Sequence, residues 1–421
     1  MHHLPSNRSE RLLQFTQNDL DGNLKAVVFD RFFAEEAYSF HFYNNGKRSE
    51  VLRILDMQDM HSLRYHRQHL IQEMDLDPAA NRFGLDHLSQ SRVLDSFPMV
   101  PYTDERQEGH SSAKNPHLTL VRELAAIHRS DLILVCSPFE LKLLRDEYRI
   151  HPEKLVLAPF FTKGIEEYHT TSTKSEELQS SIPSPHSFET RRDFVALGGF
   201  KHPPNVDQVL ILKKYIWPRI REKIPDAKLH IYGSYPPPRI QQLHDAKSGF
   251  LVHGYVDDLN LPLGQGRVLL APLRYGAGIK GKIVDAWRYG CPVVTTPIGA
   301  EGVGFNEEEY DNQGQGYNWG GQVASDNDSF IKSAIELYSD ERLWMRSQSN
   351  ARRLLKDLFD AKKNLNVVDD AIAAAVQDMH CRRQRDYTAA MLWHNTARST
   401  EYFSRWIELK ESRREDETKC K

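Results

Sequence analysis

Short apolar runs typical of buried strands alternate along this 421-residue chain with stretches of helical periodicity. The expected strands are 25–29, 52–55, 132–136, 155–158, 194–197, 228–232, 250–253, 268–271 and 292–295. The expected helices are 62–72, 118–128, 138–148, 206–224, 281–289, 329–338 and 341–359. Strands that alternate with helices form parallel sheets, because the chain must cross back over the sheet between neighbouring strands. The sequence therefore predicts an α/β fold.

Changes in polarity along the chain indicate domain boundaries. Residues 163–192 are rich in Ser, Thr and Pro with little to bury, which is typical of a linker. They separate a first α/β domain, 1–162, from a second, 193–360. Within the first domain, 75–116 is polar and without steady periodicity, which predicts an irregular insertion. A helical tail, 361–421, follows the second domain.

Composition excludes several classes of protein. With 40% hydrophobic and 27% charged residues, the chain is typical of globular proteins. A net charge of -3 argues against nucleic acid as a partner, because there is no basic excess to neutralise phosphates. The N-terminus lacks the apolar run of a secretory signal, and no apolar stretch approaches the length of a membrane span. We therefore expect a cytoplasmic protein, in agreement with four scattered cysteines: Cys136, Cys291, Cys381 and Cys420.

A glycine-rich stretch follows the expected strand 268–271. Gly276, Gly278 and Gly281 match G-x-G-x-x-G, and Glu301 lies twenty residues after the last of them. This pattern is similar to a dinucleotide-binding turn. Such a turn has its first glycine almost directly after the strand, whereas four residues intervene here. The pattern alone is therefore weak evidence for a dinucleotide.

Charge around these glycines favours a diphosphate site. Phosphates bind where backbone N–H groups converge at a helix N-terminus, and Lys280 and Lys282 add positive charge at the start of the expected helix 281–289. Lys282, Asp285 and Tyr289 share one face of that helix. The alternative is a simple glycine-rich corner, with Lys282 and Asp285 as a surface ion pair. We interpret the stretch as a phosphate site.

Residues 272–303, "PLRYGAGIKGKIVDAWRYGCPVVTTPIGAEGV", closely resemble the donor-binding segment of GT-B glycosyltransferases, specifically those of glycosyltransferase family 4. The resemblance extends over three more segments of the second half: 197–209, 224–237 and 251–259. In the first half, three segments resemble the later part of the family's acceptor domain: 27–40, 53–68 and 122–144. A complete acceptor domain opens with a strand and a Gly-rich turn, whereas this chain starts at what looks like the middle of the domain. We therefore expect an incomplete first domain.

The resemblance implies a retaining glycosyltransferase of GT-B type, with two Rossmann-like parallel α/β domains that face each other across a cleft. A UDP- or GDP-type sugar donor would be held mainly by the second domain, with a glycan, lipid-linked or small-molecule acceptor on the first. Asp285 falls where the family places a glutamate that binds ribose hydroxyls, and Gly254 and Tyr255 fall in the loop that frames the base. Beside the diphosphate the resemblance places the first loop of the donor domain: Gly198, Gly199 and Lys201.

Two further residues are implied as catalytic. His61 falls where many members carry a histidine near the transferred sugar, although a role at the N-terminus of its helix, beside Asp59 and Ser62, is an equal alternative. Lys280 is the second, because the first glutamate of the family's pair is replaced by Ala277. Together with Lys282 and the helix amides, it would stabilise charge on the leaving diphosphate.

Other candidate sites are weaker. The D-x-D patterns at 19–21 and 75–77 lack the preceding strand of a metal-binding carboxylate pair, so we interpret them as turn and cap residues. His66 and His69 share a helical face, but no acid or cysteine completes a ligand set. We predict no metal and no other cofactor.

The tail segment 386–410 carries aromatic residues among basic ones: Trp393, Tyr402, Phe403 and Trp406. It is either a helix at a membrane surface or a helix that packs back on the first domain. The gap between Trp393 and Tyr402 favours packing.

Three functions are compatible with these observations. The first is a glycosyltransferase. The second is a nucleotide-sugar-binding protein with impaired catalysis, indicated by Ala277 and the shortened first domain. The third is an NAD-type dehydrogenase, which rests on the glycine pattern alone.

Overall fold

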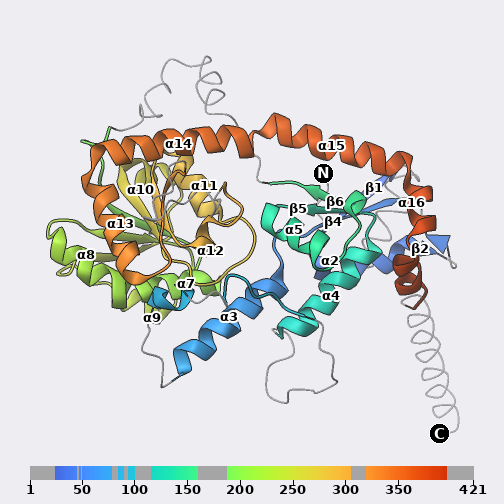
Figure 1. Cartoon of the computed structure of the whole chain (residues 1–421), viewed down its shortest axis with the longest axis horizontal. Coiled ribbons are helices and arrows are strands. Elements are labelled where there is room, and N and C mark those ends of the chain that lie inside the picture. Colours follow the sequence, from blue (N-terminus) through green and yellow to red (C-terminus); the bar gives the residue numbers. More distant parts are fainter. Residues whose placement is uncertain are drawn as a thin grey trace, which may run out of the picture.

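The computed structural model describes residues 24–44, 47–48, 50–77, 84–89, 93–99, 115–159, 187–304 and 319–395. The described strands form two parallel sheets, one in each half of the chain (Figure 1). The first sheet has the order β1-β4-β5-β6, with strands Ala26–Asp30, Leu52–Asp56, Leu132–Val135 and Leu155–Leu157. A short antiparallel pair, β2 and β3, spans Tyr43–Asn44 and Lys47–Arg48.

The second sheet has the order β12-β11-β10-β7-β8-β9. Its strands, from β7 to β12, are Arg192–Leu197, Leu229–Tyr232, Phe250–Gly254, Gly266–Ala271, Val293–Thr295 and Gly321–Val323. Every strand expected from the apolar runs is present, and the sequence pattern missed β12. Its three residues are Gly, Gln and Val, so it has no apolar run, unlike the equally short β6 and β11.

Helices cover both sheets. In the first domain they are α2 (Phe32–Tyr38), α3 (His61–Leu76), α4 (Pro116–Arg129) and α5 (Pro138–Asp146). In the second they are α7 (Pro203–Ile211), α8 (Trp217–Lys223), α9 (Pro238–Gln241), α10 (Asn260–Gln265), α11 (Gly281–Arg288), α12 (Pro297–Ala300), α13 (Asn327–Ser339) and α14 (Glu341–Phe359). Short 3-10 turns lie at Ser39–Phe42, Gly84–Ser89 and Pro152–Lys154. None of the helices in the described ranges is long and apolar enough to cross a bilayer.

The single helix expected at 206–224 is divided in the structure. A π-helical turn, Leu212–Ile216, separates α7 from α8. Pro218 lies in the first turn of α8, where it has no backbone N–H to donate and its ring would crowd the preceding turn of a continuous α-helix. A widened turn accommodates the proline and lets the chain remain helical on both sides.

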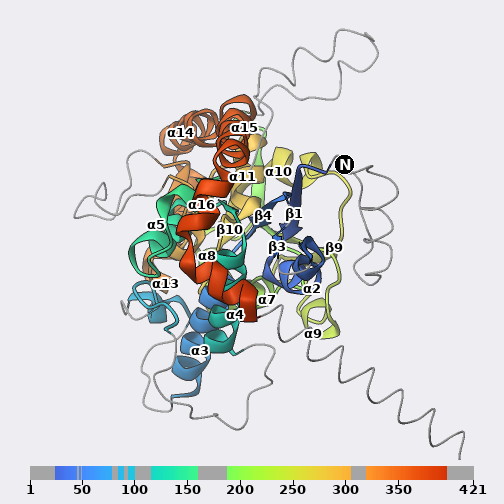
Figure 2. The same cartoon turned by 90° about the vertical axis from the view of Figure 1, so that its right-hand side faces the viewer.

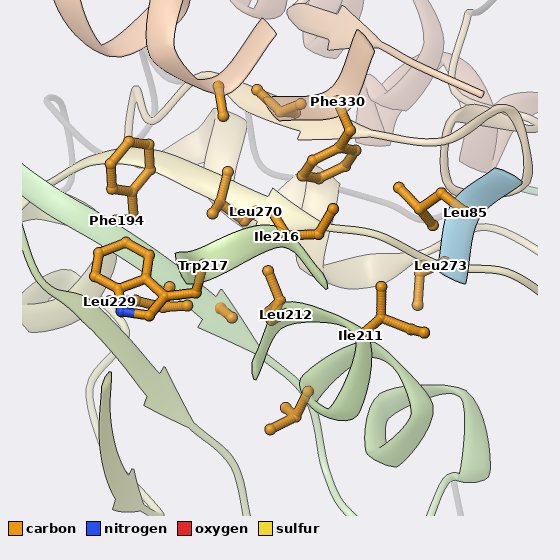
Figure 3. Close-up of a cluster of buried hydrophobic side chains, with 14 of the residues drawn as sticks. Leu85, Phe194, Ile211, Leu212, Ile216, Trp217, Leu229, Leu270, Leu273 and Phe330 are labelled. Carbon is orange, nitrogen blue, oxygen red and sulfur yellow. The ribbon is translucent and has the colours of Figure 1, made fainter. Parts of the chain in front are cut away.

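Part of the insertion expected at 75–116 is ordered and belongs to the core of the second domain. Leu85 and Leu88 are fully buried in the second domain's core. Figure 3 shows Leu85 in the same cluster as Phe330 and Leu273. The backbone N–H of Leu85 also donates to Asn327 Oδ1, at 3.1 Å. The insertion is ordered at these residues because the apolar partners that bury them come from the other domain.

The two domains are connected through α3, which extends from the first sheet to the helices of the second domain (Figure 1). Leu70 and Met74, near its end, pack against the second domain's core. The predicted linker lies mostly outside the described residues. Arg191, placed at its end by the sequence pattern, is buried and donates to the carbonyls of Leu263 and Gly266, so it belongs to the second domain.

The tail packs back on the first domain, as predicted, over its described part. After α14 the chain continues as α15 (Ala361–Gln377) and α16 (Met379–Arg385), which lie along the first sheet (Figures 1 and 2). Val368 and Met379 are buried against Leu52 and Ile54 of β4. Beyond α16, the indole Nε1 of Trp393 donates to the Arg129 carbonyl, at 3.0 Å. The other tail aromatics lie outside the described residues: Tyr402, Phe403 and Trp406.

Candidate active site

A cavity of about 410 Å³ opens at the carboxyl ends of the second domain's parallel strands. It is lined by the loops that follow β7, β8, β9 and β10, and by the first turns of α11. Ligands of open α/β sheets bind at this edge, where loops and helix N-termini converge. The cavity is therefore the candidate site.

Most residues singled out in the sequence for donor binding line this cavity. They are Gly198, Gly199, Tyr255, Gly276, Gly281, Lys282 and Asp285, and Lys280, singled out as catalytic, lines the cavity too. Three other residues singled out for donor binding are described in the structure but do not line the cavity. Lys201 stacks its ammonium over the Tyr235 ring, 3.8 Å from the centroid, and the Gly254 carbonyl accepts from the amide of Gly233. Gly278, the third, faces the first domain.

The N-terminus of α11 lies at the cavity, and the apolar face of the helix packs on the second domain's core. Ile283, Ala286 and Trp287 are buried against the sheet, as the sequence periodicity predicts. The first amides of a helix have no acceptor within the helix and carry its positive dipole end. With glycine at 281, the chain can approach a bound anion closely at this point.

Lys282 supplies positive charge inside the cavity. Its Nζ donates to Asn205 Oδ1 and to Gln208 Oε1, each at 2.7 Å, and both partners are neutral. Burial, with the nearby Lys280, lowers the pKa of Lys282 to about 7. The surface ion pair with Asp285 considered above is thus absent at this described position. The Lys282 ammonium is instead fixed by two neutral side-chain oxygens, which do not balance its charge.

Lys280 is arranged differently. Its Nζ donates to the Gly278 carbonyl at 2.7 Å and lies 3.6 Å from Glu301 Oε2. Burial lowers the pKa of Lys280, and Glu301 opposes that effect. Lys280 lines the cavity, but its ammonium is turned to an internal carboxylate. The Lys280 ammonium therefore faces Glu301 and the Gly278 carbonyl, whereas the sequence suggested that it would face the leaving diphosphate.

Glu301 occupies an internal ion-pair network. Its two carboxylate oxygens accept from Arg67 of α3 at 2.8 and 3.0 Å. Burial alone would raise the pKa of Glu301, but Arg67 and Lys280 hold it below its ordinary value. A dinucleotide site would need this acid free to bind a ribose. The engagement of Glu301 by Arg67 therefore argues against the dehydrogenase hypothesis.

Asp285 lies one turn after Lys282, at the edge of the cavity. Its carboxylate is half-buried and accepts from Arg288 at 3.4 Å, and burial raises its pKa. The carboxylate therefore lies where a ligand that has its phosphates at the helix start could offer hydroxyl groups.

Gly278 contacts the first domain. Its amide donates to Glu140 Oε1 at 2.7 Å, so it is not available to a phosphate, contrary to the glycine pattern. Its φ is +63°, and a Cβ at this position would come within 2.9 Å of the Asp59 Cβ. Glycine is required here both for its backbone conformation and for the close approach of the two domains.

His61 begins α3, outside the lining of the cavity in the described structure. Its Nε2 lies 3.3 Å from Asp59 Oδ1, and its ring packs edge-on against Phe32. The sequence suggested that Asp59 or Ser62 caps this helix, but neither side chain does so. The Glu123 carboxylate of α4 accepts from the amides of His61 and Ser62 instead, at 2.7 and 3.2 Å.

The weaker candidates have structural partners. Asp75 pairs with Arg274 at 2.7 Å and with His87 at 3.1 Å, and His66 bonds the Ser96 hydroxyl at 2.7 Å. Residues 19–21 lie outside the described residues. In the described ranges, no group of three or more His, Cys, Asp and Glu side chains is arranged to hold a metal.

Sequence reasoning missed Arg67 and Glu140. Arg67 lies on the buried stripe of α3, four residues from Leu63 and from Ile71, and a charge at a core position is a usable signal. For Glu140 the signal misleads. With Ser137 it spells the S-x-x-E pattern of a helix cap, yet no side-chain cap bond forms and Glu140 contacts Gly278.

Comparison with known proteins agrees with this geometry. Residues 191–340 match the family model described as "Glycosyl transferases group 1". The second domain is a group 1 glycosyltransferase domain. A Klebsiella pneumoniae protein, "Uncharacterized 44.6 kDa protein in cps region", is 27% identical over 200 residues, which are 44% of this chain and 49% of that protein. The chain thus spans about half the length of this curated relative.

Solved structures extend the likeness beyond the group 1 domain. S. aureus TarM, in complex with fondaparinux, alpha-GlcNAc-glycerol and UDP, matches with a TM-score of 0.53 at 12% identity, over 84% of this chain and 57% of that chain. A sucrose-phosphate synthase from Thermosynechococcus elongatus matches with a TM-score of 0.52 at 13% identity, over 91% of this chain and 80% of that chain. Anabaena HepE in complex with UDP matches with a TM-score of 0.52 at 10% identity, over 87% of this chain and 82% of that chain. The chain has the GT-B fold.

Proposed function

We propose that this protein is a retaining glycosyltransferase that uses a nucleoside-diphosphate sugar. One observation carries the proposal. Lys282, held by two neutral side chains, stands in a cavity beside the N-terminus of α11, with the Asp285 carboxylate one turn further on. A diphosphate needs positive charge, a ribose needs an acceptor for its hydroxyls, and this spacing offers both.

Each part of the donor is assigned a partner. The diphosphate is assigned to Lys282 and the first amides of α11, which stabilise the negative charge that builds up as the sugar leaves. The ribose is assigned to Asp285 and the base to the loop that carries Tyr255. This assignment uses no metal ion and no other cofactor. UDP is the first nucleotide to test, since TarM and HepE were both crystallised with it.

The acceptor is assigned to the first domain. His61 is proposed to reach the transferred sugar, with Asp59, 3.3 Å away, orienting its imidazole. A glycan, a lipid-linked sugar or a small molecule would fit this scheme, and we place the reaction in the cytoplasm.

A second candidate function is binding of nucleotide sugars without turnover. It is favoured by Ala277, which takes the place of an acidic residue in the resembling enzymes, and by Lys280, whose charge Glu301 already balances. Both functions predict the same donor site and differ only in turnover.

The experiment is release of nucleoside diphosphate from a panel of UDP and GDP sugars, with calorimetry of the same ligands. Release together with binding supports the transferase, and binding without release supports the second function. If neither a nucleotide nor a sugar nucleotide binds, both fail. Where transfer is found, the anomeric configuration of the product by NMR tests retention.

A further inference from the structure

Two side chains of the first domain bond the backbone of the glycine-rich loop that follows β10. Arg67, fully buried on α3, donates from Nη1 to the Gly276 carbonyl at 3.0 Å. The same guanidinium is bonded through both terminal nitrogens to Glu301, at 3.0 and 2.8 Å, which fixes its plane. Its position is further fixed by the Phe139 ring, 5.2 Å away.

Glu140, on α5 of the first domain, holds the same loop two residues later. Its Oε1 accepts from the Gly278 amide at 2.7 Å and from the Met60 amide at 3.1 Å. Met60 immediately precedes α3, the helix that begins with His61 and carries Arg67. One carboxyl oxygen therefore joins the start of this helix to the loop of the other domain.

The loop needs such support because its sequence does not favour one conformation. Glycine at 276, 278 and 281 leaves the backbone wide freedom, and Gly278 has a φ of +63°. A loop that must be ordered when its ligand arrives loses affinity by the cost of that ordering. A loop already held in shape avoids this loss.

We propose that Arg67 and Glu140 are positioning residues, which hold the glycine-rich loop of the second domain in the conformation that receives the donor's diphosphate. The inference rests on the proposed function only in naming that ligand. Its consequence is that donor affinity depends on docking of the first domain. The second domain supplies the groups that contact the nucleotide, and the first domain holds the loop that carries some of these groups.

The chain offers a matched control. Asp75, also on α3, reaches across the same interface to Arg274, which keeps a second carboxylate partner in Asp207. Asp75→Asn thus weakens an interdomain ion pair of the same chemical kind without removing a bond to residues 276–281. Glu140→Gln is the conservative variant, because its amide oxygen can still accept from both N–H groups, whereas Glu140→Ala cannot.

The first measurement is hydrogen–deuterium exchange of the full-length protein without ligand. Arg67→Met and Glu140→Ala should speed exchange in peptides that cover 276–282 by about ten-fold or more, since each loses a buried hydrogen bond to the loop. Peptides from β7 and β8 should be unchanged, which separates local loosening from global unfolding. Glu140→Gln should restore protection, and Asp75→Asn should match the wild type. Unchanged loop exchange in both Arg67→Met and Glu140→Ala overturns the inference.

The second measurement is calorimetry with UDP. Arg67→Met and Glu140→Ala should raise its dissociation constant by about ten-fold, and Asp75→Asn by less than about two-fold. Equal affinity in wild type and the two loop variants overturns the inference even if exchange differs. If the loop variants exchange faster but the wild type binds no nucleotide, the support of the loop stands and the proposed function fails.

Discussion

Lys282 and Asp285 lie one turn apart on the same face of α11, and each is bonded to a different partner. Lys282 donates to Asn205 and Gln208 of α7, while Asp285 accepts from Arg288 on its own helix. An ion pair between them would have neutralised both groups. The two partners of Lys282 are neutral, so its charge remains available to a bound anion, whereas Asp285 would exchange the 3.4 Å contact with Arg288 for hydroxyl groups of a ligand.

The first prediction is that nucleotide affinity falls as the pH rises. Burial lowers the pKa of Lys282 to about 7, so at higher pH the free protein carries a neutral amine there. A diphosphate favours the charged form, so binding takes up a proton. Above pH 7 the dissociation constant of UDP should rise by about ten-fold per pH unit.

Calorimetry at pH 6 to 9, in buffers of different ionisation enthalpy, measures both the affinity and the proton uptake. Lys282→Arg keeps a permanent charge and should remove the pH dependence. A wild-type affinity that stays constant over this range would contradict the assignment of Lys282 to the phosphates.

The second prediction concerns Asp285. Charge-assisted hydrogen bonds to two ribose hydroxyls are worth on the order of 1.5–3 kcal/mol each. Asp285→Ala should therefore weaken UDP binding by about ten-fold or more, and Asp285→Glu should be tolerated. Arg288→Ala removes the present partner of Asp285 and serves as control, with no loss of affinity expected. If Asp285→Ala binds UDP as the wild type does, its carboxylate only pairs with Arg288.

The fold of the second domain could be predicted because its determinants are local. Apolar runs mark its strands, and the alternation of Lys282 and Asp285 with Ile283 and Trp287 identifies which face of α11 is buried. The same local pattern proposed Gly276 and Gly281 at the cavity, where the structure has them. These features depend on periodicity, which a single sequence carries.

The rest depends on contacts between residues far apart in the chain. Glu301 looked like a ribose-binding acid, but Arg67, 234 positions earlier, holds it inside the interface. Gly278 looked like a phosphate ligand, but Glu140, 138 positions earlier, takes its amide. No pattern within one segment can reveal such partners, because both depend on how the two domains dock.

The third prediction concerns stability and the buried Glu123 carboxyl. It caps α3 by accepting from the amides of His61 and Ser62 and from the Ser62 hydroxyl. Burial raises its pKa from 4.5 to about 7, so between these values the folded protein binds the proton more tightly than the unfolded chain. Stability from this group is fully present below pH 4.5 and is lost as the pH rises through 7.

The difference in unfolding free energy between wild type and Glu123→Gln isolates this effect, because other titrating groups are common to both. It should change by roughly 3 kcal/mol between pH 4.5 and 8, in favour of the variant at the higher pH. Denaturant unfolding at several pH values measures it. A difference that does not vary with pH would show that Glu123 keeps an ordinary pKa.

The last prediction separates a transferase from a binding protein, and it depends on His61. If His61 reaches the transferred sugar, its contribution is greatest in the transition state, where positive charge develops on the ring. Removing such an interaction lowers turnover more than ground-state binding. His61→Ala should thus reduce nucleoside diphosphate release by about a hundred-fold, with UDP affinity changed by only about two- to three-fold. The backbone amide that Glu123 caps is retained in this variant, so α3 should keep its start. Phe33→Ala removes a ring that packs beside His61 and is the control for a purely structural loss. If both variants reduce turnover equally, His61 acts through packing, and its catalytic assignment fails.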